Sequence, residues 1–257
     1  MLTRAITAFI LIGLFLPLFI IGGNTVYLMV LGVGALILYE VTSLRAKELP
    51  VWLRVLVILG YLLASFMDLP YLAMICFLMS FILIVIAVWN EKIKLEDVFM
   101  LAYICSFISF VAHAFLVIGL LDNMYMLIIA VITYANDTGA YFGGYFLGKH
   151  KFNERVSPKK TWEGSVAGFL VSVLSACLMY MIFPHLLGSL TTAILIGVVL
   201  GVGGQMGDLM FSMIKRHYQI KDFSNLLPGH GGLTDRIDSI CINFILFQLM
   251  FVFLLTL

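Results

Sequence analysis

Nine long apolar stretches dominate this sequence and favour a protein that crosses a membrane many times. A membrane-spanning helix needs about 20 mostly apolar residues. The chain has 63% apolar and 11% charged residues, and its mean hydropathy is +1.11. A soluble domain has about 45–50% apolar and about 25% charged residues, so a soluble enzyme, a disordered tail and a disulfide scaffold are excluded. The stretches cover residues 5–21, 25–39, 51–66, 71–89, 98–118, 124–147, 165–183, 190–211 and 239–257. We therefore expect an all-α, polytopic membrane protein with about nine transmembrane helices.

The basic residues are divided very unequally between the two sides that nine crossings would create. One side would hold the N-terminus and the loops near residues 40–54, 90–97, 148–164 and 212–238, and these segments contain all 15 Lys and Arg residues. The positive-inside rule places this side in the cytoplasm. We expect an integral, multi-pass protein of the cell membrane with a cytoplasmic N-terminus. The net charge of +1 predicts no bulk attraction to nucleic acid.

The two halves of the chain differ in where their polar residues lie. Residues 1–123 have short loops and no polar motif, which predicts an N-terminal transmembrane scaffold of five spans. Residues 124–257 contain glycine-rich polar segments and carboxylates inside apolar stretches, which predicts a catalytic region of four spans with cytoplasmic loops 148–164 and 212–238. The four cysteines all lie in apolar stretches, so neither a disulfide framework nor a zinc site is expected.

The first polar segment, residues 136–144, follows directly on an apolar run and places Asp137 within or at the end of a span. Ionisable residues at such positions are costly and are usually functional or paired. A buried, hydrogen-bonded carboxylate without a catalytic role is the alternative for Asp137. The glycines at positions 139, 143, 144 and 148 have small-xxx-small spacings, which predict close helix packing.

The second segment, residues 157–164, precedes the seventh apolar stretch. Ser157 followed by Pro158 is typical of the N-cap and first residue of a helix, so we expect Lys159 and Lys160 in its first turn. Cations there oppose the helix dipole, and a bound anion would reverse that penalty. The segment therefore predicts either an anion site or a basic loop that contacts lipid headgroups.

A third segment places a polar stripe on the eighth apolar stretch. On a continuing helix, Asp208, Ser212 and Lys215 lie at positions i, i+4 and i+7 and therefore share one face. The segment also contains Gly197-x-x-x-Gly201 and Gly203-x-x-x-Gly207, which suit either a dimer or packing within one chain.

The fourth segment begins in a loop and ends on the last helix. Residues 228–232 read Pro-Gly-His-Gly-Gly, which predicts a loop with exposed backbone amides. Asp235 and Asp238 then open the last helix at positions i and i+3 and share a face. Helix capping is the simpler explanation of these two aspartates, although it leaves the neighbouring arginine, histidine and glycines unexplained.

These segments together contain a set of carboxylates and a set of cations. The carboxylates are Asp137, Asp208, Asp235 and Asp238, and the cations are Lys159, Lys160, Lys215, Arg216, Lys221 and Arg236. Carboxylates with water and phosphate oxygens suit Mg²⁺, and the cations and glycine loops suit a polyphosphate. The chain has no Walker-type phosphate loop. The residues alone thus predict metal-assisted phosphoryl or nucleotidyl transfer at the cytoplasmic surface of the membrane.

The last two segments also resemble the signature of the phosphatidate cytidylyltransferases, or CDP-diacylglycerol synthases. The residues that carry the resemblance are Ser212-x-Ile214-Lys215-Arg216, Lys221-Asp222 and His230-Gly231-Gly232-Leu233-x-Asp235-Arg236-Ile237-Asp238. Residues 137–141 and 157–164 are similar to family motifs as well. The motif-bearing part covers about residues 134–240, whereas the N-terminal half agrees only in hydropathy. Thr234 departs from the pattern, which has an apolar residue there.

The resemblance implies that CTP and phosphatidate react to give CDP-diacylglycerol and pyrophosphate with Mg²⁺. It implies that Asp208, Asp235 and Asp238 anchor the metal and form the catalytic set with Lys215. Asp137 would be a nearby metal ligand or would contact one. The residues expected to bind substrate are Ser157, Lys159, Lys160, Thr161, Arg216, Lys221, His230, Gly231, Gly232 and Arg236. His230 would either donate to a phosphate or order its loop.

Several alternatives stay open at this point. A CTP-dependent lipid kinase would transfer the γ-phosphoryl group, and a transporter would explain acidic residues in the membrane but not the two basic loops on one side. A second cation beside Mg²⁺ and a homodimer are also open. The expected partners are CTP, phosphatidate and membrane lipids.

Overall fold

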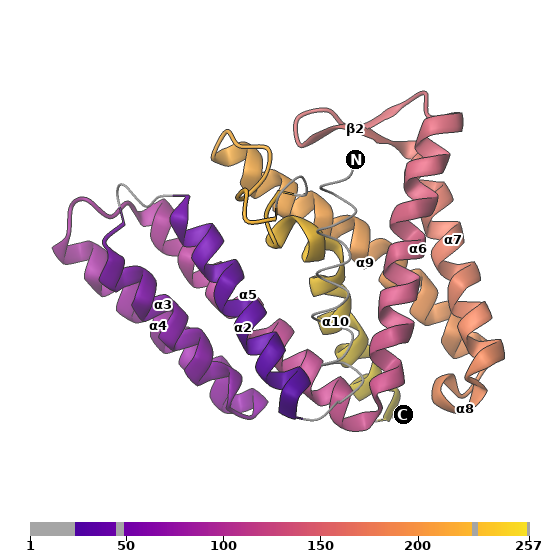
Figure 1. The fold of residues 1–257 in the computed structure, drawn as a ribbon, viewed down its shortest axis with the longest axis horizontal. Helices are drawn as coiled ribbons and strands as arrows, with labels where there is room; N and C mark the ends of the chain where they lie inside the picture. Colours follow the sequence, from indigo (N-terminus) through magenta and orange to yellow (C-terminus); the bar gives the residue numbers. More distant parts are fainter. Residues whose placement is uncertain (1–23, 45–48, 228–230, 256–257) are drawn as a thin grey trace. The chain divides into compact units, whose positions relative to one another are not determined.

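The computed structural model describes residues 24–44, 49–227 and 231–255, and most of them are helical (Figure 1). The helices are α2 (Asn24–Ser43), α3 (Val51–Ser65), α4 (Leu69–Trp89), α5 (Leu95–Leu121), α6 (Asn123–Leu147), α7 (Trp162–Ile182), α8 (Pro184–Leu187), α9 (Leu190–His217) and α10 (Thr234–Leu255). Two short strands, β1 (Lys151–Asn153) and β2 (Ser157–Thr161), lie between α6 and α7.

Every predicted apolar stretch after the first corresponds to one helix, and the first lies outside the described residues. Within the described part of the chain, six helices are long and apolar enough to cross a membrane, namely α2, α4, α5, α7, α9 and α10. Helix α3 is apolar but has only 15 residues. Helix α6 has 25 residues and carries the polar segment around Asp137. The prediction of an all-α, polytopic membrane protein is confirmed.

The described residues form two compact units, which we describe separately. The first contains residues 24–116 together with residues 222–235. The second contains residues 117–221 and 236–255. The first boundary falls after residue 116, and the later segment 222–235 groups with the first unit.

The first unit is built on close packing of α2, α3 and α5. A side chain at Gly34 would collide with Tyr61 of α3 and would touch Ile108 of α5. Tyr61 is fully buried, and its hydroxyl donates to the Val30 carbonyl of α2 at 3.2 Å. A buried phenol therefore finds an acceptor in a helix backbone, and the absent side chain at Gly34 makes room for it.

The glycines of helix α9 in the second unit allow close packing against two different helices, α7 and α10. A Cβ at Gly197 would lie 2.7 Å from the Val173 backbone of α7, and Gly201 also faces α7 at Ser172. A Cβ at Gly207 would lie 2.8 Å from the Asp238 carbonyl of α10, and Gly203 also faces α10. Both glycine pairs are thus filled by packing within the chain, so they give no support to a dimer.

Helices α6 and α7 approach each other just as closely. A Cβ at Gly139 would lie 2.8 Å from Val171, and one at Gly143 would collide with Ala167. From the other side, a Cβ at Gly164 would lie 2.7 Å from the Ala140 carbonyl. The prediction that the glycines of residues 139–148 serve helix packing is therefore confirmed for Gly139 and Gly143.

The segment before α7 departs from the sequence-based expectation. Residues 157–161 form strand β2, which pairs antiparallel with β1 through Lys151 opposite Thr161 and Asn153 opposite Ser157. Helix α7 begins at Trp162, and the Thr161 hydroxyl caps it by accepting from the Gly164 amide at 3.2 Å. The prediction that Lys159 and Lys160 lie in the first turn of a helix is wrong, because pairing with β1 overrides the local Ser-Pro signal.

Candidate active site

An ion pair between β2 and α9 defines the candidate site in the second unit. The Lys160 ammonium contacts the Asp208 carboxylate, and the two side chains are 31% and 28% exposed. Alternate residues of a strand point to opposite faces, so Lys160 of β2 points toward Asp208 while its neighbour Lys159 points away. Lys159 accordingly is exposed. Partial exposure leaves both charges within reach of a ligand from outside the protein.

The polar stripe predicted on the eighth apolar stretch is present on α9. The helix continues without a break to His217, so Asp208, Ser212 and Lys215 share one face. The Ser212 hydroxyl donates to Asp208 at 3.3 Å. Lys215 is only 8% exposed and interacts electrostatically with Asp238 of α10. One face of α9 therefore carries both a carboxylate and a shielded ammonium.

Two further carboxylates belong to this group. Asp137 of α6 interacts electrostatically with Asp208 and Lys160, and the Ser239 hydroxyl hydrogen-bonds to it. Asp238 interacts electrostatically with Asp208 and Asp137. Like charges repel each other, so three neighbouring carboxylates need nearby cations. The second unit thus brings together five of the predicted site residues, and we call Asp137, Lys160, Asp208, Lys215 and Asp238 the charged cluster.

A layer of buried amide side chains, from Asn136, Gln205 and Asn243, lies on the same helices close to the cluster. The Gln205 amide of α9 donates to Asn136 Oδ1 of α6 at 3.0 Å and to the Ser165 carbonyl of α7 at 2.9 Å. The Asn243 amide of α10 donates to Thr133 Oγ1 of α6 at 2.8 Å. These bonds tie the helices that carry Asp137, Asp208 and Asp238. This layer was not predicted, although its polar residues are visible within the apolar stretches of the sequence.

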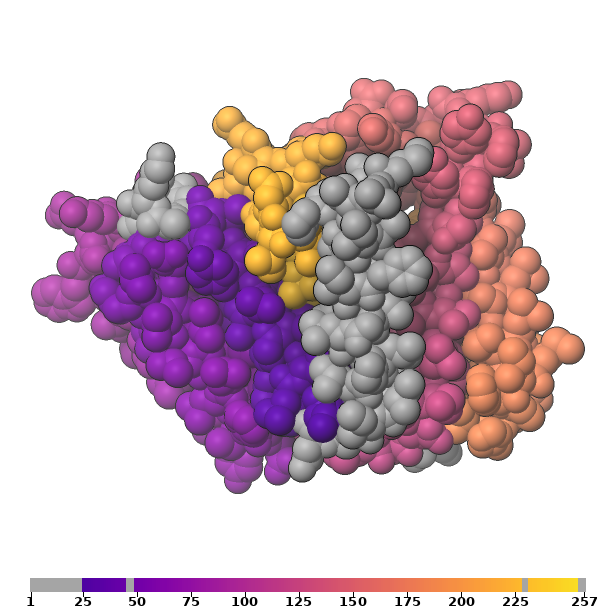
Figure 2. Space-filling model, in the orientation of Figure 1, coloured from indigo at the N-terminus to yellow at the C-terminus, as the bar shows by residue number. Residues whose placement is uncertain are grey.

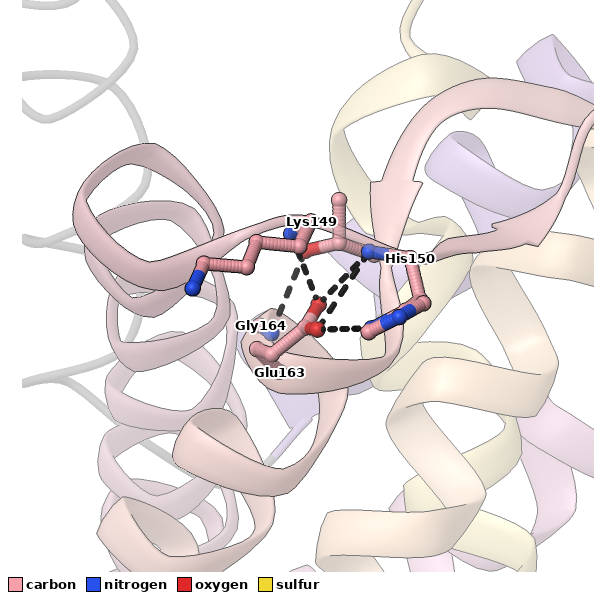
Figure 3. A network of polar contacts seen from close by, with 5 residues as sticks. Lys149, His150, Glu163 and Gly164 are labelled. Carbon is pink, nitrogen blue, oxygen red and sulfur yellow. Dashed lines mark hydrogen bonds and ion pairs between the residues drawn. The ribbon is translucent and has the colours of Figure 1, made fainter.

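The hairpin that carries Lys160 is fastened to the start of α7 by one carboxylate (Figure 3). Glu163 accepts from the backbone amides of Lys149 at 3.1 Å and His150 at 3.2 Å, and its Oε1 lies 2.6 Å from His150 Nδ1. The Trp162 amide also donates to the His150 carbonyl at 2.9 Å. Both ends of the hairpin are therefore fixed beside the first turn of α7.

Two of the predicted substrate-binding residues, Thr161 and Arg216, hold the local backbone in place. Thr161 is buried and caps α7 as described above. Arg216 donates through Nε to the Val156 carbonyl at 3.2 Å and through Nη1 to the Ile220 carbonyl at 3.0 Å. Arg216 thus ties the hairpin to the end of α9. Lys221 and Arg236 are exposed, and Ser157 is partly buried in β2.

The signature loop, residues 222–235, is organised within the first unit, and His230 lies outside the described residues. Asp235 Oδ2 accepts from the Phe223 amide at 2.8 Å and from the Gly232 amide at 3.0 Å. Gly231 has a φ of +86°, a conformation that favours glycine. The structure therefore gives Asp235 contacts that order the loop, and its role as a metal ligand stays a prediction.

Glu40, which contacts this loop, lies in the half of the chain that the sequence predicts to be scaffold. Glu40 of α2 is only 2% exposed and accepts four hydrogen bonds from residues 224–234. The sequence contains one sign of it, a lone carboxylate at the end of an apolar stretch. Such a residue is costly in a membrane protein unless it is paired.

The described residues contain no group of three His, Cys, Asp or Glu side chains that lie close enough together to hold a metal ion by themselves. Mg²⁺ does not require such a group, because it usually binds one or two carboxylates and completes its shell with waters and substrate phosphates. The neighbouring carboxylates Asp208, Asp238 and Asp137 match this chemistry. The charged cluster therefore fits Mg²⁺ as a site completed by a phosphate ligand.

Carboxylates and lysines gathered in this way in a helical membrane protein are typical of membrane-embedded enzymes that act on phosphate groups. Residues 2–254 match the model of the cytidylyltransferase family, and the chain belongs to this family. The phosphatidate cytidylyltransferase of Bacillus subtilis (strain 168) is 30% identical over 257 residues, which cover 92% of each chain.

Two staphylococcal relatives carry the same name. The phosphatidate cytidylyltransferase of Staphylococcus haemolyticus (strain JCSC1435) is 31% identical over 252 residues, covering 93% of this chain and 94% of the relative. That of Staphylococcus epidermidis (strain ATCC 12228 / FDA PCI 1200) is 44% identical over 115 residues, covering 45% of this chain and 44% of the relative. The similarity is thus spread over nearly the whole chain and is stronger in one part of it.

Proposed function

We propose that this protein is a phosphatidate cytidylyltransferase, which converts CTP and phosphatidate into CDP-diacylglycerol and pyrophosphate. The observation that carries the proposal is the Lys160–Asp208 ion pair beside two further carboxylates, in a chain of the cytidylyltransferase family. The names of its relatives support this reaction over lipid phosphorylation and over transport.

The reaction needs charge neutralisation more than it needs a base. An oxygen of the phosphatidate phosphate attacks the α-phosphorus of CTP, and a new phosphorus–oxygen bond forms. The bond between the α-phosphorus and the bridging oxygen breaks, and pyrophosphate leaves with its electron pair. Since the nucleophile is already an anion, the main barrier is the approach of two anions. Cations that bind both phosphates lower this barrier.

The residues of the charged cluster supply these cations and hold them in place. Lys160 is partly exposed and can bind a phosphate, whereas the shielded Lys215 lies near Asp238 and interacts with it electrostatically. Lys159, Lys221 and Arg236 are exposed and would extend the basic surface toward the rest of the nucleotide and the lipid headgroup. Arg216 would act mainly by holding the hairpin through Val156.

Bound Mg²⁺ would neutralise phosphate charge and help align the α-phosphorus for in-line attack. Asp208 and Asp238 would bind it directly, and Asp137 would be a ligand or would hold one through a hydrogen bond. Asp235 remains a predicted ligand in addition to its contacts within the loop. A metal titration with each divalent cation in turn would show whether a second cation takes part.

The active site would face the cytoplasm, where CTP is made, and the lipid substrate would enter from the membrane. The concentration of all 15 Lys and Arg residues in one set of predicted loops supports this orientation. Since the charged cluster comes from a single chain, a homodimer is not required.

The test uses purified protein, phosphatidate and CTP labelled at either the α- or the γ-phosphorus. We expect α-label in a lipid product and γ-label in pyrophosphate, both only when phosphatidate is present. Transfer of γ-label to the lipid would instead identify a CTP-dependent lipid kinase. Absence of both label transfer and pyrophosphate release would contradict an enzymatic role for the cluster.

A further inference from the structure

The buried carboxylate of Glu40 contacts the signature loop, which is almost 200 positions away in the sequence. Its Oε1 accepts from the Ser224 hydroxyl at 2.6 Å and from the Leu233 amide at 2.9 Å. Its Oε2 accepts from both the amide, at 2.9 Å, and the hydroxyl, at 2.6 Å, of Thr234. Figure 2 shows the loop beside the end of α2 that carries Glu40.

The position of Glu40 explains how a carboxylate can be buried in an apolar helix. Two of its donors are the amides of Leu233 and Thr234, at the start of α10. The first amides of a helix have no partner within the helix, and they carry the positive end of its dipole. Glu40 therefore acts as a helix cap supplied by another part of the chain.

A second carboxylate also holds this loop. Asp235 accepts from the amides of Phe223 and Gly232, next to the residues that Glu40 holds. A Cβ at Gly232 would lie 3.0 Å from the Glu40 carboxylate and 3.1 Å from that of Asp235. A side chain at Gly232 would therefore be crowded by both carboxylates, and at least one of them would have to shift.

We propose that Glu40 is a positioning residue for the reaction, because it ties Ser224 of the loop to the start of α10, directly after the loop glycines. The proposal rests on the proposed function, since Gly231 and Gly232 are predicted to bind phosphate and α10 carries Asp238. Glu40 itself touches no substrate in this proposal. Its four hydrogen bonds hold the amides of Leu233 and Thr234 and the hydroxyls of Ser224 and Thr234 in one arrangement before the substrates arrive, which lowers the entropic cost of binding them.

The first experiment compares Glu40→Gln with the wild-type protein in detergent micelles. The amide of glutamine cannot accept on its nitrogen, so two of the four donors lose their acceptor and the loop loosens. We expect tryptic cleavage after Lys221, at the start of the loop, to become at least tenfold faster. Glu96→Gln, an exposed glutamate at the start of α5, is the matched control and should cleave like wild type.

The second measurement separates positioning from a loss of folded protein. A smaller folded fraction lowers kcat but leaves KM unchanged. Loosening of a phosphate-binding loop should instead raise the KM for CTP or for phosphatidate at least tenfold in Glu40→Gln. Wild-type KM values together with a wild-type cleavage rate would overturn the proposal.

Two milder variants keep the test informative if Glu40→Gln fails to insert. Ser224→Ala and Thr234→Val each remove one hydroxyl donor, and each should raise the same KM by a smaller factor. Normal KM values in both would contradict the proposal. Because proteolysis needs no substrate, a wild-type protein without transferase activity would reject the proposed function while the cleavage rates still report on the Glu40 contact.

Discussion

Lys160 and Asp208 form an ion pair that joins a two-stranded hairpin to a membrane helix. The whole of α7 separates the two residues in the sequence. The pair brings a cation and a carboxylate to one partly exposed place. A phosphate with its metal ion needs both charges there, so the pair makes a specific prediction about each partner.

Replacing Lys160 should damage catalysis more than folding. Lys160→Gln removes the ammonium but keeps a side chain of similar length. Loss of a hydrogen bond to a charged group costs about 1.5–3 kcal/mol, so we expect kcat/KM to fall about 10- to 150-fold. Steady-state kinetics and thermal unfolding of the same preparation measure both effects.

The neighbouring lysine provides the control for this variant. Lys159 is exposed on the same strand, and Lys159→Gln should reduce kcat/KM by much less. Equal effects of the two substitutions would favour a general basic surface that binds lipid headgroups. That result would argue against a specific role of the Lys160–Asp208 pair.

The close approach of α9 and α10 should be essential for the geometry of the cluster. A Cβ at Gly207 would lie 2.7 Å from Ile242 and 2.8 Å from the Asp238 carbonyl, so Gly207→Ala must separate the helices that carry Asp208 and Asp238. We expect a destabilisation of about 1–3 kcal/mol from overpacking, and loss of most activity. Gly32→Ala in α2 is the control, since no described residue outside its own helix lies within 4 Å of its added Cβ, and it should be neutral or slightly stabilising.

The buried amide layer should contribute to stability through Gln205. Gln205→Leu leaves the buried Asn136 Oδ1 without this donor, and an unsatisfied buried group costs about 1–3 kcal/mol. We expect a lower thermal midpoint in detergent. Gln248→Leu, a partly exposed position on α10, should leave the midpoint unchanged. A stable Gln205→Leu protein with full activity would show that the layer is dispensable.

The orientation can be tested at the two ends of α7. Single cysteines replace Glu154 in the hairpin and His185 in α8, both exposed, in a background without the four native cysteines. An impermeant thiol reagent outside intact cells should label only position 185. Labelling at position 154 would reverse the orientation and place the cluster outside the cytoplasm.

Features that depend on neighbouring residues in the sequence could be predicted well. Each apolar stretch in the described part of the chain corresponds to one helix, because apolar length is a local property of the sequence. The stripe of Asp208, Ser212 and Lys215 was predicted because helical spacing fixes which residues share a face.

Features that depend on distant residues could not be predicted. Ser157 and Pro158 carry a local helix-start signal, yet their segment pairs with β1 across a turn. Glu40 was missed because its donors lie at residues 224–234, and a single sequence does not reveal such a long-range contact. Similarly, whether the glycines of α9 serve a dimer or internal packing was decided only by their neighbours on α7 and α10.

The central claim is that the carboxylates of the charged cluster support metal-dependent nucleotidyl transfer. Its most direct test is Mg²⁺-dependent pyrophosphate release by Asp208→Asn and Asp238→Asn, with exposed Asp68→Asn as the control. Each cluster variant should lose at least about 100-fold in turnover, which corresponds to about 2.7 kcal/mol, while Asp68→Asn stays normal. Near-normal turnover in both cluster variants would contradict the assignment of the metal site.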